Sequence, residues 1–406
     1  MFRKSCLVCE SEELREIINL GMHPFADTFI PKDKASEADL IYPLICDLCF
    51  SCGHVQTRCI TSPEARYSQH DYSYTSSNSN FSRSHWDEYC KEMIKDLNLK
   101  EGSLIIEVGS NDGYLSEQFQ KGGLKAVGVD PSPYMAELAK KRNVNTIIDL
   151  FDEKVGNLIE EKYGKASLVA ANNVYNHSNN PLSFTKAVAK ILSPKGYFVF
   201  EQPYWLTTIQ SGKFDQIYHE HVSYYTVKSA KRLLEKAGMK IKSAKIVNYH
   251  GKSLRIIAQL ASELEEGSEE AKKMIEKEEE YGLFSEMLYK NYMDENVKNR
   301  NLFLEKIHKI KNEEGSIIAV GAAAKGNTFL NFYNLDNSIL DYVTDSSPHK
   351  QGKYTPATRI PIVGDDIFSK YIGKKIYALI LSWNIADQLK PILNRINPNI
   401  QFLVPD

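Results

Sequence analysis

Leu104-Ile-Ile-Glu-Val-Gly-Ser-Asn-Asp-Gly113 reads as an apolar strand that enters a glycine turn and opens a helix. A second apolar strand, in Ala126-Val-Gly-Val-Asp-Pro-Ser132, ends at Asp130, 17 residues after Gly113. This order places helix N-terminal N–H groups and a carboxylate beside one nucleoside-sized crevice. The glycines, Gly109-x-x-x-Gly113, depart from the G-x-G-x-x-G pattern of dinucleotide sites. The alternative interpretation is an ordinary connection between a strand and a helix.

The glycine loop resembles the opening loop of S-adenosylmethionine (SAM) methyltransferases. SAM carries no phosphate, but its ribose hydroxyls need an acceptor, and we assign that role to Asp130. Glu107 and Asp112 are expected to meet the cationic methionine end. The resemblance implies a SAM site made of Glu107, Gly109, Asn111, Asp112, Gly113, Asp130, Asn172 and Asn173.

Size and composition limit the possible functions. The chain has 406 residues, enough for two or three domains, and its net charge of −2 does not suit a nucleic-acid backbone. The N-terminus lacks the apolar core of a signal peptide, and no run of 18 apolar residues occurs. We therefore expect a cytoplasmic protein with no nucleic-acid or membrane partner. The sequence leaves the oligomeric state open between a monomer and a weak dimer.

Two cysteine pairs near the N-terminus predict a metal site. Cys6-x-x-Cys9 and Cys49-x-x-Cys52 can each form a tight turn, and together they offer four thiolates to a tetrahedral zinc ion. Cys46 forms a competing pair with Cys49, and we prefer Cys52 because a glycine follows it. A four-thiolate site is structural, so chelation should loosen the domain without removing a catalytic group. The alternative is that these cysteines are buried as small hydrophobic residues.

Strands and helices alternate with short loops in the middle of the chain, which predicts a doubly wound parallel sheet. Polar residues follow two of the strands, in Asn172–His177 and in Glu201–Tyr204, and ligands bind at such strand ends. His177 is therefore a candidate site residue, although a loop histidine can also be a solvated surface residue. The expected elements are Trp86–Leu97, Tyr114–Lys121, Tyr134–Arg142 and Leu182–Ile191 as helices, and Leu104–Val108, Ala126–Val129, Leu168–Ala171 and Tyr197–Glu201 as strands.

Ionisable residues crowd the segment Phe214–Tyr225. Asp215, Tyr218, His219, Glu220 and His221 fall within seven positions, interspersed with apolar residues. Such a cluster suits deprotonation of carbon, which needs a base with a tuned pKa and neighbours that balance the charge of an enolate. A catalytic iron or zinc site is the weaker interpretation, because the two histidines lack an evident third ligand.

Taken together, these blocks resemble the sugar C-methyltransferases that act on nucleotide-linked 4-keto-deoxyhexoses, the tetronitrose C-3'-methyltransferase type. The similarity runs nearly from end to end. Two blocks depart from the family pattern, at Lys252 and at Ala357-Thr-Arg359, and both bear on specificity for the sugar and the nucleotide. The matching blocks are the cysteine pairs with Pro43-Leu44, Asp71–Ser77, the glycine loop, Asn173–His177, Ile217–His221, His250–Arg255, Gly321–Thr328, Lys350–Pro356 and Leu381–Asn384.

The resemblance implies an α/β chain in three parts. These are a small zinc-binding domain (residues 1–70), a central doubly wound, Rossmann-like SAM domain (71–245) and a C-terminal Rossmann-like α/β domain that helps to hold the nucleotide sugar (246–406). Residues 262–280 are mostly charged and are expected to form a solvated helix face. In Gly321-x4-Gly326 the lysine precedes the second glycine, which argues against an NTPase loop. Lys325 either meets a diphosphate or is a solvated surface lysine.

The resemblance also implies a mechanism and its residues. A ketone at C4 acidifies the neighbouring C–H, so a base can form an enolate that attacks the methyl group of SAM. His221 is the expected base and Glu220 its orienting or charge-balancing neighbour. Tyr218 and His177 contact the enolate or sugar oxygens, and Tyr72 or Tyr74 closes the pocket.

Three other functions compete with this hypothesis. A SAM-dependent O-methyltransferase acting on a sugar hydroxyl would use a similar base but would not exchange the hydrogen beside the ketone. An NAD-dependent oxidoreductase or epimerase is disfavoured by the absence of G-x-G-x-x-G after a strand. A non-enzymatic binding protein would leave the cluster from Tyr218 to His221 without a purpose. The sequence does not identify the sugar, the methylated carbon, the pathway, or the nucleotide as dTDP, GDP or CDP.

Overall fold

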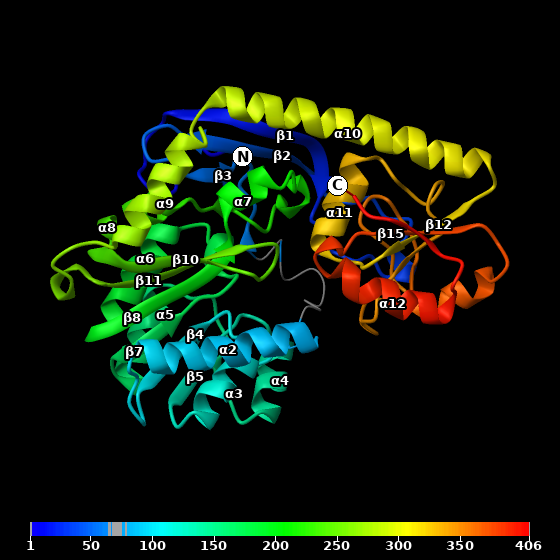
Figure 1. The fold of residues 1–406 in the computed structure, drawn as a ribbon. Helices are drawn as coiled ribbons and strands as arrows, with labels where there is room; N and C mark the ends of the chain where they lie inside the picture. Colours follow the sequence, from blue (N-terminus) through cyan, green and yellow to red (C-terminus); the bar gives the residue numbers. More distant parts are fainter. Residues whose placement is uncertain (1, 64–65, 67–74, 78, 406) are drawn as a thin grey trace.

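Three β-sheets organise the protein in the computed structural model, which describes residues 2–63, 66, 75–77 and 79–405 (Figure 1). The sheets follow one another along the chain, with the largest in the middle. The α/β class and the three-part organisation expected from the sequence are therefore confirmed.

The N-terminal sheet is antiparallel and has the order β1-β2-β3-β9. Its fourth strand, β9, lies much later in the sequence than the other three. Residues 223 and 224 therefore complete a sheet whose other strands end before residue 58. The strands are β1 (Leu14–Pro24), β2 (Ile41–Cys49), β3 (Val55–Thr57) and β9 (Ser223–Tyr224), with a 3-10 turn η1 (Lys32–Lys34) between β1 and β2.

The central sheet has the order β10-β11-β8-β7-β4-β5-β6 and is parallel except for β11. Helices cover both faces, which explains the nearly continuous apolar run in β4: Ile105 packs beneath α2 and α3, and Ile106 packs toward α5 and α6. The strands are β4 (Leu104–Val108), β5 (Lys125–Val129), β6 (Asn145–Ile147), β7 (Ala166–Ala170), β8 (Leu192–Pro203), β10 (Met239–Val247) and β11 (Ser253–Leu260). The helices are α2 (Asn80–Asp96), α3 (Tyr114–Lys121), α4 (Pro133–Lys141), α5 (Glu153–Tyr163), α6 (Pro181–Ile191), α7 (Trp205–Gln210) and α8 (Val227–Lys236), with 3-10 turns η2 (Tyr175–His177) and η3 (Phe214–Gln216).

Most expected elements of this part occur, with shifted ends. Helix α2 begins six residues before the expected Trp86, because Ser79 caps its N-terminus by accepting a hydrogen bond from the Ser82 N–H (3.1 Å). The sheet also continues to Leu260, beyond the expected domain boundary at residue 245, since β10 and β11 form its antiparallel edge hairpin. Strand β6 and helix α5 were not expected from the sequence.

The C-terminal sheet is parallel with the order β14-β13-β12-β15-β16, so the chain reverses direction across the sheet between β12 and β15. This is the strand order of a Rossmann-like half. Its elements are β12 (Ser316–Val320), α11 (Ala324–Phe332), β13 (Tyr342–Thr344), β14 (Ile362–Val363), η5 (Asp365–Tyr371), β15 (Ile376–Ile380), η6 (Trp383–Ile385), α12 (Ala386–Ile396) and β16 (Gln401–Leu403).

Two helices link the central and C-terminal parts. Helix α10 (Glu286–Asn312) runs along the N-terminal sheet toward the C-terminal domain (Figure 1). Helix α9 (Glu269–Glu280), after the 3-10 turn η4 (Ala261–Glu263), is highly charged as expected, but it is not wholly solvated. Its Glu278 is fully buried and accepts hydrogen bonds from the Lys228 N–H (3.2 Å) and the Tyr204 hydroxyl (2.9 Å).

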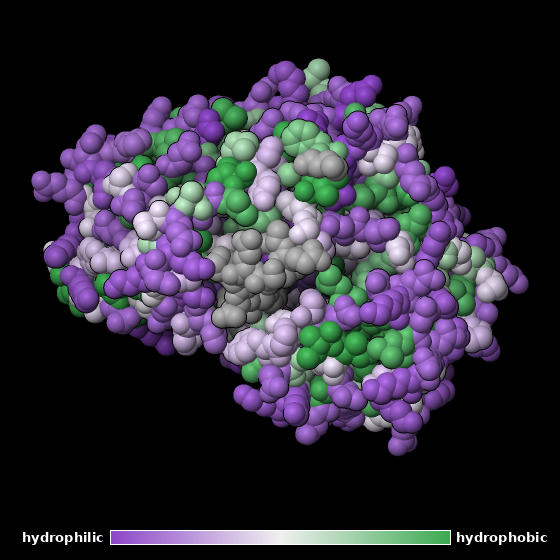
Figure 2. All heavy atoms as spheres, turned by 180° about the vertical axis from the view of Figure 1, so that it is seen from behind, coloured by the Kyte–Doolittle hydropathy of each residue, from purple (hydrophilic) through white to green (hydrophobic). Residues whose placement is uncertain are grey.

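The surface is mainly hydrophilic on the face that Figure 2 shows, where hydrophobic residues gather in separate patches. Within the ranges that the structure describes, none of the helices is both long and apolar enough to cross a membrane.

Candidate functional site

The four cysteines of the predicted metal site converge. The sulfur atoms of Cys6, Cys9, Cys49 and Cys52 lie within 4.8 Å of one another, with 3.6 Å between Cys6 and Cys52 and 3.5 Å between Cys9 and Cys49. A tetrahedral zinc ion with Zn–S bonds of about 2.3 Å needs sulfur separations of about 3.8 Å. Donor type and spacing therefore fit Zn²⁺ with all four positions taken, as in a structural site.

Cys46 does not belong to this cluster. It lies three residues before Cys49 on β2, and an odd separation places two strand residues on opposite faces. Each ligand pair is held by a backbone turn, through Glu10 N–H to Cys6 O (2.9 Å) and Gly53 N–H to Cys49 O (2.8 Å). The choice that the sequence left open is thus resolved in favour of Cys52.

The glycine loop after β4 needs its glycines. Gly109 and Gly113 have φ angles of 70° and 75°, and a Cβ at either would lie under 3.0 Å from Val174 or Ala139. Asn111 also adopts a positive φ of 50°, so its N–H points toward Asp130 at the end of β5.

Asp130 accepts hydrogen bonds from the backbone N–H groups of Asn111 and Ser132, each at 2.9 Å. Its two oxygens retain lone pairs for further donors, as the expected ribose contact requires. Glu107 lies behind the loop and accepts a hydrogen bond from the Ser116 hydroxyl. Burial raises the pKa of Glu107 to about 8.

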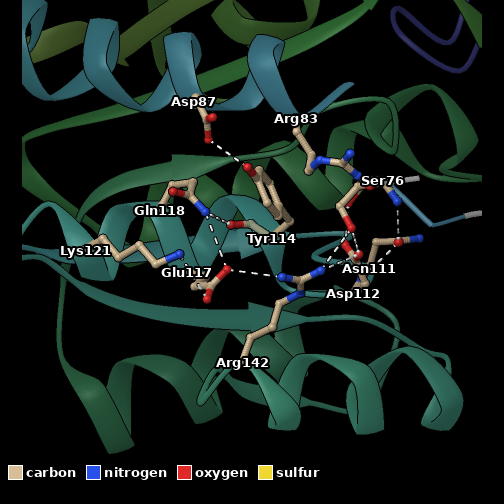
Figure 3. Close-up of polar contacts among 11 residues, drawn as sticks. Ser76, Arg83, Asp87, Asn111, Asp112, Tyr114, Glu117, Gln118, Lys121 and Arg142 are labelled. Atoms are coloured by element: carbon tan, nitrogen blue, oxygen red, sulfur yellow. Dashed lines mark hydrogen bonds and ion pairs between the residues drawn. The ribbon is translucent and has the colours of Figure 1, made fainter. Parts of the chain in front are cut away.

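Asp112 and Asn111 bind the segment that precedes α2 (Figure 3). The Asn111 side-chain oxygen accepts from the Ser76 N–H (2.9 Å), and Asp112 accepts from the Ser76 hydroxyl (2.7 Å). Arg142 bridges Asp112 (3.4 Å) and Glu117 (3.2 Å) beneath them. The Asp112 carboxylate thus faces protein donors, whereas the sequence suggested the cationic end of SAM as its partner.

A cleft of about 1020 Å³ opens at the carboxyl ends of the central strands. This volume is ample for a nucleoside-sized ligand. Of the expected site residues, Gly109, Asn111, Asp130, Asn173 and His177 line it. The others that the structure describes lie outside its lining: Glu107, Asp112, Gly113, Asn172, Tyr218, Glu220 and His221.

Asn172 and Asn173 shape the wall between β7 and β8. Asn172 accepts a hydrogen bond from the Glu201 N–H (2.9 Å), and Asn173, with a φ of 53°, donates its own N–H to Glu201 O (2.7 Å). Asn173 thereby reaches the cleft while Asn172 supports it.

Several lining residues were not expected from the sequence. Asp149, Leu150 and Phe151 follow the short strand β6 just as Asp130 follows β5, and an acid after a strand was the signal that could have revealed them. Lys34 and Lys353 come from the N-terminal and C-terminal parts of the chain and add positive charge to the cleft.

His221 lies beside His177, which lines this cleft, and it has a defined hydrogen-bonding state. Its Nδ1 lies 3.0 Å from the Gln216 carbonyl oxygen, which can only accept, so Nδ1 carries the proton. Its Nε2 is then free to accept from the Tyr218 hydroxyl (2.6 Å). The ring of His177, which lines the cleft, meets the His221 ring edge to face at 4.9 Å between centres. Burial lowers the pKa of His221 to about 3 and keeps the imidazole neutral.

The Glu220 carboxylate contacts the N-terminal part of the chain. One carboxylate oxygen accepts the Asp27 N–H (3.0 Å), and burial raises the pKa of the group to about 7. The orienting contact that the sequence suggested for Glu220 is made instead by the carbonyl of Gln216. Tyr72 and Tyr74, the candidates for closing the pocket, lie outside the described residues.

Lys325 is held within the C-terminal domain. Its ammonium donates to the Asn384 side-chain oxygen and lies 4.3 Å from the centre of the Trp383 ring. Trp383 in turn donates from its indole nitrogen to Asp215 (2.6 Å). These contacts show that Lys325 is not a solvated surface residue, and burial lowers its pKa to about 8. It lies outside the cleft lining, where Lys34, Arg66 and Lys353 supply positive charge.

We expect His219 to give stability a pH dependence. The ring is buried against Phe25 and Tyr42, and burial lowers its pKa to about 4 from an ordinary value near 6.5. The unfolded chain therefore takes up this proton first as the pH falls. The contribution of neutral His219 to the free energy of unfolding is fully present above pH 6.5 and is lost as the pH falls toward 4.

Replacing His219 with Phe removes that dependence. The free energy of unfolding of the variant, relative to the native protein, should rise by roughly 2 kcal/mol between pH 7.5 and pH 5. Urea unfolding at both pH values measures this difference, with His308→Phe on the exposed side of α10 as the control. Equal differences at both pH values would show that His219 titrates normally.

Three family models match consecutive parts of the chain. They describe a zinc binding domain over residues 6–67, a methyltransferase domain over 82–244 and a C-methyltransferase C-terminal domain over 248–405. C-methyltransferase NovU of Streptomyces niveus is 27% identical over 384 residues, which cover 95% of this chain and 90% of that protein. A ubiquinone biosynthesis O-methyltransferase of Xanthomonas campestris is 26% identical over 97 residues, covering 23% of this chain and 41% of its own.

Solved structures resemble the central part more distantly. Magnesium protoporphyrin IX methyltransferase from Synechocystis PCC 6803 with bound SAM covers 44% of this chain and 79% of its own, at 14% identity and a TM-score of 0.34. A SAM-dependent methyltransferase from Clostridium acetobutylicum covers 45% and 93%, at 16% identity and a TM-score of 0.36. The three matched models and the relative of similar length agree with the cysteine cluster and the sheet order. The chain belongs to the C-methyltransferase family with these three domains, and it is a SAM-dependent methyltransferase.

Proposed function

We propose that this enzyme methylates a carbon beside the ketone of a nucleotide-linked 4-keto-deoxy sugar. The observation that carries this proposal is the pairing of His221 with Tyr218 beside His177, a residue that lines the central cleft. Methylation of such a carbon requires a base, because the C–H bond must be broken before the carbon becomes nucleophilic. SAM, when bound, supplies an electrophilic methyl group.

The tautomer of His221 suits the role of base. Gln216 holds the proton on Nδ1, so Nε2 has the lone pair that accepts a proton, directly or through the Tyr218 hydroxyl hydrogen-bonded to it. The C–H electron pair stays on the substrate as an enolate, and the proton ends on Nε2. Burial disfavours the imidazolium in the free enzyme, but the enolate that forms beside it supplies the compensating negative charge.

The remaining residues suit positioning and charge balance. His177 lies against His221 on the cleft side and can contact a sugar or enolate oxygen. Lys34 and Lys353 approach the cleft from the two flanking domains and match the negative charge of a diphosphate. The sugar and its nucleotide carrier are inferred from the family resemblance, together with these lysines.

The test of the proposal is incubation with SAM and a panel of nucleotide-linked 4-keto sugars in deuterated water. We expect deuterium to enter the carbon beside the ketone and the methyl group to appear on the same carbon by NMR and mass spectrometry. Methylation of a hydroxyl without deuterium uptake would establish the O-methyltransferase alternative instead.

Substitution of the base should abolish both steps together. His221→Ala should lower turnover and deuterium uptake by roughly 100-fold or more, with little change in SAM affinity. Tyr218→Phe tests whether the hydroxyl relays the proton. The control is His308→Ala, which removes an exposed histidine of α10 outside this segment. Full activity of His221→Ala would assign the base to another residue.

Asp130 should determine cofactor affinity. Asp130→Asn replaces one carboxylate oxygen by an amide donor, which cannot accept from a ribose hydroxyl, so the Kd for S-adenosylhomocysteine should rise about tenfold or more by calorimetry. Asp87→Asn is the control, because Asp87 lies on α2 and accepts a hydrogen bond from the Tyr114 hydroxyl of α3 (2.9 Å) (Figure 3). An unchanged Kd for Asp130→Asn would remove Asp130 from the cofactor site.

A further inference from the structure

The segment that carries His221 continues directly into the sheet of the zinc-binding domain. Strand β9 begins two residues after His221 and pairs with β3, with Ser223 opposite Gln56 and Tyr224 opposite Val55. The Thr57 N–H also donates to the carbonyl of Val222 (3.0 Å). The position of His221 along the cleft is thus tied to β3.

The other end of β3 is tied to the metal turn. Val55 follows Cys52 by three residues, and the turn between them is closed by Cys49 N–H to His54 O (2.8 Å). Gly53 in this turn has a φ of 73°, and a Cβ there would collide with the Phe284 ring. A bound zinc ion would therefore fix the first residue of β3, Val55, while its last residue, Thr57, contacts the His221 segment through Val222.

Two buried side chains add direct links between the turn and the segment. His54 Nε2 lies 3.2 Å from the Ser223 hydroxyl, and the Thr226 hydroxyl donates to the carbonyl of Gly53 (3.3 Å). His54, Ser223 and Thr226 are each no more than 1% exposed, so no water competes for these contacts.

Gln56 brings in the first cysteine pair. Its side-chain oxygen accepts the Leu7 N–H (2.8 Å) and its amide nitrogen donates to Ser5 O (3.0 Å), on either side of Cys6. Its backbone meanwhile pairs with Ser223. Both metal turns are thus connected to β3, and β3 is connected to β9.

We propose that the zinc site positions His221 through β3 and β9, so that zinc occupancy controls proton removal although the metal never touches the reacting atoms. The role of His221 rests on the proposed function. The loops that follow strands β4, β5 and β6, which form the expected SAM-binding side of the cleft, should respond much less because they receive no residue of β3. Loss of zinc should therefore disturb the His221 segment and leave the SAM-binding loops nearly unchanged.

A pair of matched variants tests this link. Cys46 and Cys49 are both fully buried on β2, but only Cys49 faces the metal. Cys49→Ala should lose zinc and show amide hydrogen exchange at least about tenfold faster in residues 214–226, while residues 104–130 and the Kd for S-adenosylhomocysteine change less than about twofold. Cys46→Ala should keep zinc and native exchange throughout. If Cys49→Ala does not fold, the native enzyme stripped by a chelator and reloaded with Zn²⁺ provides the same comparison.

Native protection of residues 214–226 in the zinc-free protein would overturn the proposal. Equal loss of protection in residues 104–130 would overturn it as well, because the effect would then be general unfolding. Metal content, hydrogen exchange and cofactor binding are all measured without a sugar. Failure of the native enzyme to exchange hydrogen on 4-keto sugars would therefore refute the proposed function and leave the structural link standing.

Discussion

The hydrogen bond between the Gln216 carbonyl and His221 Nδ1 is the contact on which the proposed chemistry depends. A carbonyl can orient an imidazole only if the backbone around it is rigid, and residues 214–222 are fastened from all three domains. His219 donates to Pro43 O of the first domain (3.3 Å), Val222 N–H donates to Asn176 O of the second (2.9 Å), and the Thr328 hydroxyl donates to Ile217 O from the third (3.0 Å). All three domains therefore hold this one short segment in place through hydrogen bonds.

The two Rossmann-like sheets differ in whether the space at the carboxyl ends of their strands is open. In the central sheet, the crevice after β4 is open and forms the cleft. In the C-terminal sheet, the corresponding place after β12 is occupied by the protein's own groups. Ala322 N–H donates to Asp345 (3.0 Å), and the Lys350 ammonium donates to Ala322 O (2.6 Å). The C-terminal domain thus contributes α11, which contacts the segment of His221, and Lys353, which lines the central cleft.

Sequence patterns predicted those parts of the molecule that carry their own local signal. Strand β4, its glycine loop and Asp130 were predicted because apolar runs, glycines at positive φ and an acid at a strand end are all local. Strand β9, of two residues, exists only through its pairing with β3 and leaves no such pattern. The same limit explains Glu220 and His221: the sequence showed adjacent ionisable groups, but the acceptor that orients the His221 imidazole is a main-chain carbonyl, which no residue type reveals.

The placement of β9 also constrains how the chain acquires its structure. The N-terminal sheet pairs residues 55 and 56 with residues 224 and 223, so its last edge stays open until more than half of the chain has been made. Until then β3 presents unpaired N–H and carbonyl groups, the template on which foreign strands add and aggregates begin. Contacts so distant along the chain also form slowly. A fragment that ends before β9 would keep all four cysteines of the metal site, but its strand β3 would be an unpaired edge prone to aggregation.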